Sequence, residues 1–174
     1  MLFETDYPGA VAAFKGEAAF TLDVAVSRFH HVLSQLDDEQ VWARPHAGMR
    51  AVGHGVLHVS EHLTQWITVG CDPDRSDRVT DDDRKDLAEH ASCGEWTTAK
   101  LAEHLDSAVA HAKAVLAGLN KDHLLEARKI CGPEVEVTGM GAVWHSVAHV
   151  QAHAQEAVYA ARLLLGDAWR SREV

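Results

Sequence analysis

Long apolar runs are missing from the 174 residues. No stretch of about 18 apolar residues is free of charge, and this pattern excludes a membrane-spanning helix. Basic residues are scarce, 16 against 26 acidic ones, and the net charge of -10 disfavours nucleic-acid and membrane-surface partners. Residues 1–9 lack the apolar core of a secretion signal, so we expect a cytoplasmic protein.

Cysteine and proline are also scarce. The three cysteines, Cys71, Cys93 and Cys131, form no CxxC pair, which argues against a disulfide framework and favours reduced thiols. Cys71 and Cys93 lie near the ends of predicted helices, where a thiol is either reactive or inert. Only four prolines occur, and each lies where other signals also indicate a loop. Because strand-like alternation is nearly absent, long helices are the predicted structure.

Apolar residues recur every three or four positions along four segments, and this spacing predicts four amphipathic helices. The predicted helices span residues 9–36, 51–69, 97–119 and 138–165. A shorter helix is predicted over residues 82–91. Thr138 is a suitable N-cap for the fourth long helix, and Gly166 is a suitable end. We therefore expect one all-α domain over residues 1–174, an antiparallel four-helix bundle with long loops after its first and third helices.

Histidine is unusually frequent, with 13 in the chain, and two series of histidines have a regular spacing of four residues. The series are His54, His58 and His62 in the second predicted helix, and His145, His149 and His153 in the fourth. Residues four apart lie on one side of a helix, so an HxxxH pair can chelate one divalent metal ion. A third histidine from a facing helix would complete a site suited to zinc, nickel or iron.

The helical wheel separates the members of each series. In the fourth helix His149 and His153 point away from the polar face, with Glu156 beside His149, and they are the better pair of ligands. In the second helix the wheel slightly favours His62 over His58. The alternative is that these are ordinary surface or core histidines. Because two such series occur in one bundle, the metal hypothesis and this alternative have about equal weight.

Three stretches of the chain resemble the DinB family of metal-dependent enzymes. They are LDDEQVWARPHAGMRAVGHGVLHVSEH (residues 36–62), WTTAKLAEHLDSAVAHAKAVLAGLNKDHL (residues 96–124) and VTGMGAVWHSVAHVQAHAQEAVYAARLLLG (residues 137–166). The resemblance implies a four-helix bundle, often a homodimer, with a divalent metal on three histidines. It places one ligand at His58, against the slight preference of the wheel, and the HxxxH pair at His149 and His153.

Relatives in this family include thiol S-transferases that use bacillithiol or mycothiol, and a mycothiol-dependent maleylpyruvate isomerase. This chain lacks the tryptophan-threonine-arginine stretch associated with the isomerase branch, so the resemblance favours that branch less. It also has Ala154, Gln155 and Glu156 after His153, where the family often has arginine, glycine and glutamine. The family's substrate contacts are therefore not carried over to this chain, whereas the three metal ligands are.

The resulting hypothesis is a metal-dependent transferase or hydrolase that acts on a small molecule. A thiol or a water molecule, activated on the metal, would attack an electrophilic substrate, with mycothiol or bacillithiol as the thiol. Glu156 would act as the catalytic residue by orienting His149 or by moving a proton, and an ordinary polar role is its alternative. His62 and His145 would support the ligands or face solvent.

The alternative hypothesis is a non-catalytic, stress-response binding protein, a homodimer in which the metal is structural or absent. An open coordination position separates the two hypotheses. A catalytic metal binds water or substrate at that position, whereas a structural metal takes a fourth protein ligand there. His62 and Glu156 are the candidates for that fourth ligand.

Overall fold

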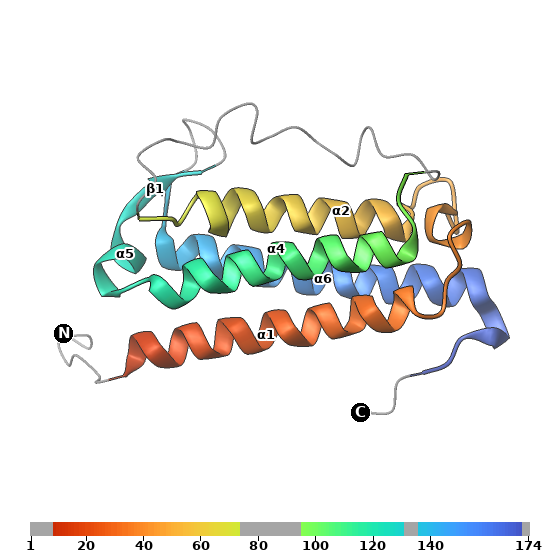
Figure 1. Ribbon diagram of the computed structural model, residues 1–174, viewed down its shortest axis with the longest axis horizontal. Coiled ribbons are helices and arrows are strands. Elements are labelled where there is room, and N and C mark those ends of the chain that lie inside the picture. Colours follow the sequence, from red (N-terminus) through yellow and green to blue (C-terminus); the bar gives the residue numbers. More distant parts are fainter. Residues whose placement is uncertain (1–8, 74–94, 131–135, 172–174) are drawn as a thin grey trace.

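Four long helical segments pack side by side within residues 9–73, 95–130 and 136–171, the part of the chain that the computed structural model describes (Figure 1). They are α1 (Ala10–Leu33), α2 (Val52–Leu63) with its π-helical continuation η2 (Thr64–Val69), α4 (Thr98–Gly118) and α6 (Gly139–Leu165). The colours in Figure 1 show that α1 and α6 run in one direction and that α2 and α4 run in the opposite one. The predicted all-α fold is confirmed, and the helices begin and end close to the predicted residues.

The connections between the long helices differ in structure. The loop after α1 contains one short 3₁₀-helix, η1 (Gln40–Trp42). The connection from α4 to α6 contains a short helix, α5 (Lys121–Leu125), and two antiparallel strands, β1 (Ala127–Lys129) and β2 (Glu136–Thr138). The sequence did not predict these strands because three residues are too few for an alternating pattern to be recognised. A last 3₁₀-helix, η3 (Gly166–Ala168), follows α6. The helix predicted over residues 82–91 lies outside the described residues.

The core lies along the helical stripes that the apolar spacing predicts. The largest fully buried side chains of the long helices include Leu22, Phe29, Leu57, Leu63, Ile67, Leu101, Leu105 and Leu116. They come from α1, from α2 with η2, and from α4, and small buried residues of α6 such as Ala154 and Ala161 pack against them. The small residues let α6 approach its neighbours closely, so functional side chains on α6 and α2 can meet.

The helix ends are fixed by side chains that the sequence partly identified. Thr138 caps α6, because its hydroxyl oxygen accepts a hydrogen bond from the backbone N–H of Gly141 at 3.0 Å. Thr97 caps α4 in the same way, because its hydroxyl oxygen accepts a hydrogen bond from the backbone N–H of Lys100 at 3.2 Å. Lys15 of α1 donates to the carbonyl oxygens of Ala117 and Leu119 at 2.7 and 2.8 Å. These bonds join the start of α1 to the end of α4, where the helix dipole favours a positive charge.

No helix within the described residues is long and apolar enough to cross a membrane.

Substitution of Gly139, the first residue of α6, is expected to destabilise the protein. A Cβ atom at this position would collide with the backbone carbonyl of His123, which cannot move aside as a flexible side chain can. We expect Gly139→Ala to lower the free energy of unfolding by about 1–3 kcal/mol. The matched control is Gly16→Ala in α1, where an added Cβ meets nothing within 4 Å. That substitution should raise the free energy of unfolding by about 0.5–1 kcal/mol.

Chemical denaturation of both variants checks this prediction. If both substitutions changed the free energy of unfolding equally, the close contact between Gly139 and the backbone of His123 in α5 would be contradicted.

Candidate metal centre

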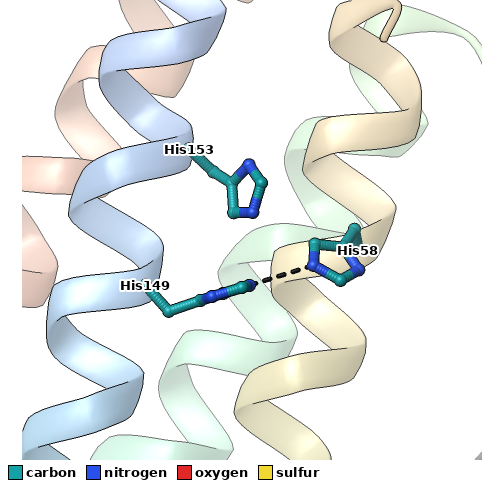
Figure 2. A group of neighbouring side chains, drawn as sticks. All are labelled: His58, His149 and His153. Atoms are coloured by element: carbon teal, nitrogen blue, oxygen red, sulfur yellow. Dashed lines mark hydrogen bonds between the residues drawn. The ribbon is translucent and has the colours of Figure 1, made fainter.

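Three histidine side chains meet between α2 and α6. His58 extends from α2, and His149 and His153 extend from α6, as Figure 2 shows. One nitrogen from each ring lies within 4.8 Å of the other two, and Nε2 of His149 lies 2.9 Å from Nε2 of His58. The ring planes are inclined to one another by 58°, 80° and 68°. Their nitrogens can therefore converge on one point, as an ion with three imidazole ligands requires.

A second group of histidines lies next to the first and has a different geometry. It consists of His62, His145 and His149, whose nitrogens also lie within 4.8 Å of one another. Here the rings are closer to parallel, with interplanar angles of 13°, 38° and 29°. A metal ion binds in the plane of an imidazole, so rings that are stacked face to face cannot share one ion without turning. The group of His58, His149 and His153 is the better candidate metal centre.

His62 packs against the candidate ligands instead of joining them. Its ring stacks on His149 with centroids 3.9 Å apart, and on Trp66 with centroids 5.3 Å apart and an interplanar angle of 9°. The wheel that slightly favoured His62 over His58 identified the more deeply buried residue, since His62 is only 8% exposed. Burial therefore favours His62, whereas the geometry of a metal site favours His58. Trp66, which the sequence analysis did not single out, completes the stack that holds the His149 ring.

Glu156 contacts a different histidine from the one expected. The sequence placed it beside His149, but Nδ1 of His153 donates a hydrogen bond to its Oε2 at 2.7 Å. The two residues are three apart on α6, a spacing that brings side chains together on a helix. The bond fixes the tautomer with hydrogen on Nδ1 and leaves the Nε2 lone pair of His153 for a metal ion.

Burial keeps two of these imidazoles neutral. It lowers the pKa of His149 to about 4 and that of His62 to about 2, and repulsion from neighbouring charges adds to the effect. For His149 those neighbours are His153, His58, His145 and the guanidinium of Arg50. A metal ion binds only the unprotonated imidazole. His149 therefore meets this requirement at neutral pH without losing a proton.

Other candidates from the sequence lie apart from the three histidines. His54 packs edge-on against Trp42, with ring centroids 4.9 Å apart, at the start of α2. The Cys71 thiol is buried, and burial raises its pKa to about 11, so the inert alternative applies to it. Cys93 and Cys131 lie outside the described residues.

A small cleft adjoins the candidate metal centre. It is lined by Arg50, Ala51, Val52, Gly55, His153, Glu156, Ala157 and Ala160. Arg50 precedes α2 in an exposed loop position, and the sequence offers no periodic signal that would have identified it. The cleft brings a charged side chain, apolar walls and one candidate ligand together.

These features define a class of protein: a helical bundle with a three-histidine candidate metal centre between two of its helices. The chain belongs to the DinB superfamily, whose family model matches residues 21–157. No curated protein sequence matches the chain.

Solved structures with low sequence identity share the fold. A conserved protein from Enterococcus faecalis has a TM-score of 0.65 at 20% identity, over 87% of this chain and 96% of that one. The mycothiol-dependent maleylpyruvate isomerase has a TM-score of 0.61 at 14% identity, and a mutant of it has 0.62. This chain spans 60% of the isomerase, and the alignment covers 82% of this chain.

The buried imidazoles predict how stability depends on pH in the metal-free protein. Below about pH 6.5 histidines of the unfolded chain take up protons. The low folded-state pKa values of His62 and His149 prevent the same uptake in the folded protein. The free energy of unfolding should therefore fall as the pH is lowered from about 6.5 towards 4.

Denaturation of chelator-treated protein at several pH values measures this fall. In His62→Phe the stacked ring is kept and one titrating group is removed, so the fall should be shallower. In His111→Gln, at an exposed position of α4, it should match the unmodified protein. Identical profiles for His62→Phe and the unmodified protein would contradict the prediction.

Proposed function

We propose that the chain is a metal-dependent enzyme in which a small thiol or a water molecule attacks a small electrophilic substrate. The observation that carries the proposal is the convergence of His58, His149 and His153 beside a cleft. A divalent ion held there would lower the pKa of a bound thiol or water and supply a nucleophile at neutral pH. Three imidazoles suit zinc, nickel or iron.

The surroundings of the three histidines support a ligand role. Glu156 holds the ring of His153 in one tautomer, and the stack of Trp66 and His62 holds the ring of His149. Carboxylate partners of this kind commonly orient histidines that bind metals. We propose this positioning role for Glu156 in place of the contact with His149 that the sequence suggested.

An open coordination position favours the enzyme over the non-catalytic alternative. Of the two candidates for a fourth ligand, His62 lies parallel to His149, and Glu156 is engaged with Nδ1 of His153. Neither belongs to the group of side chains whose ligand atoms lie within 4.8 Å of one another at His58, His149 and His153. A metal there would keep a position for substrate or water, as catalytic sites do.

A thiol is the co-substrate that the structural neighbours suggest. One of them is described as a mycothiol-dependent isomerase, so a low-molecular-weight thiol such as mycothiol or bacillithiol is our first proposal. Hydrolysis by water remains the second form of the same chemistry. A homodimer and a small-molecule substrate also remain part of the proposal.

Metal content tests the proposed ligands directly. Protein purified without a histidine tag should contain about one divalent ion per chain. His58→Ala and His149→Ala should each lose the ion because two imidazoles hold it too weakly. His111→Ala, at an exposed position on another helix, should keep it. Elemental analysis gives the metal content of each variant.

Added zinc provides a second measurement with the same variants. A concentration of 100 times the Kd should raise the free energy of unfolding of the unmodified protein by about 2.7 kcal/mol. It should have little effect on His58→Ala and His149→Ala. Full metal retention in these two variants would refute the site. An unmodified protein that binds no zinc, nickel or iron would favour the non-catalytic alternative.

Glu156 should contribute to metal affinity through His153. We expect Glu156→Ala to weaken zinc binding by about 10–100-fold, because the ring of His153 then loses its fixed tautomer and orientation. Glu156→Gln keeps a hydrogen-bond acceptor, so its affinity for zinc should lie between those of the unmodified protein and Glu156→Ala. Gln155→Ala removes an exposed neighbour and is the control. Competition titration with a chromophoric chelator measures the affinities, and equal values for Glu156→Ala and Gln155→Ala would contradict this role.

A further inference from the structure

Arg50 is a charged residue that the fold itself does not use. Its side chain is exposed, and within the described residues it has no hydrogen bond or ion pair. It nevertheless lines the same cleft as His153, and its positive charge helps to lower the pKa of His149. A guanidinium that stabilises no other group and faces a candidate site is available for a ligand.

The remaining lining of the cleft determines what kind of ligand fits. Val52, Ala157 and Ala160 form small apolar walls, and a Cβ added at Gly55 would meet nothing within 4 Å. The other charged group in the lining is Glu156, whose Oε2 accepts the hydrogen bond from His153 at 2.7 Å. Among the residues that the structure describes, the cleft therefore offers a cation with no hydrogen bond or ion pair at Arg50 and a candidate metal ligand at His153, with apolar surface between helices α2 and α6.

We propose that Arg50 binds a carboxylate of the substrate or of its thiol partner while the reacting end of that molecule faces His58, His149 and His153. The planar guanidinium presents paired N–H donors that match the two oxygens of a carboxylate. The inference rests on the proposed function and narrows it to small anionic molecules. Because Arg50 touches the ligand and not the reacting atoms, its role is binding and selection.

Two thiols of equal chain length test this proposal. 3-Mercaptopropionate carries a carboxylate, and 3-mercaptopropanol is neutral. The protein is loaded with cobalt(II). The sulfur-to-cobalt charge-transfer band in the near ultraviolet then reports thiol binding without any reaction taking place. We expect the unmodified protein to bind 3-mercaptopropionate about tenfold more tightly than 3-mercaptopropanol, as one charge-assisted hydrogen-bonded pair would provide.

Variants assign that preference to Arg50. Arg50→Gln should bind both thiols equally, with the affinity for 3-mercaptopropanol unchanged, and Arg50→Lys should keep part of the preference. Arg44→Gln removes an exposed arginine from the same loop outside the cleft, so it should behave like the unmodified protein. Gly55→Leu would place a side chain in the cleft and should weaken the binding of both thiols.

The outcomes separate this inference from the function on which it rests. Equal binding of both thiols by the unmodified protein, or a preference that survives Arg50→Gln, would refute the role of Arg50 and leave thiol activation standing. A cobalt-loaded protein with no sulfur band for either thiol would refute both the role of Arg50 in thiol binding and thiol activation at the metal, and it would leave hydrolysis by water as the form of the proposed function. Loss of the preference in Arg44→Gln as well would show that general charge, and not Arg50, causes it.

Discussion

The register between α2 and α6 is the constraint on which the candidate site depends. The two helices pack in opposite directions, so His58 lies opposite His149 and His62 lies opposite His145. A shift of α2 by one residue would turn His58 by about 100° and separate these pairs. The apolar residues of α2 that hold this register are Val52, Val56, Leu57, Val59 and Leu63. The apolar contacts that form the core therefore also set the geometry of the site.

Burial of imidazoles in this contact has two opposite consequences. It removes protons from His149 and His62, which prepares an imidazole ligand for a metal ion. It also leaves neutral polar rings inside the bundle, and Nδ1 of His62 has no hydrogen-bond partner within the described part of the chain. Stacking against Trp66 and His149 gives the His62 ring a packed environment in place of hydrogen bonds. The lowered pKa values that keep these imidazoles unprotonated therefore also reduce the free energy of unfolding in acid.

Net charge and local charge give different information about partners. The excess of acidic residues disfavours polyanions as partners of the whole molecule. A single guanidinium at the edge of the cleft can still select a small anion, because a contact at hydrogen-bond distance outweighs the weak, screened field of distant surface carboxylates. The proposed role of Arg50 is therefore compatible with the acidic composition, which disfavours polyanions and leaves small anions open.

The sequence by itself determined the long helices, their caps and the two histidine series, because these features depend on residues three or four apart. In the fourth helix the wheel also indicated His149 and His153, the two histidines that meet His58. In the second helix it could not decide which histidine meets a partner, and it slightly favoured His62 where ring geometry favours His58. The strands β1 and β2, the bond from His153 to Glu156 and the position of Arg50 in the cleft were also decided by tertiary structure. Ring orientation depends on how α2 and α6 pack, and α2 and α6 are separated by about half of the chain, so no local pattern encodes it.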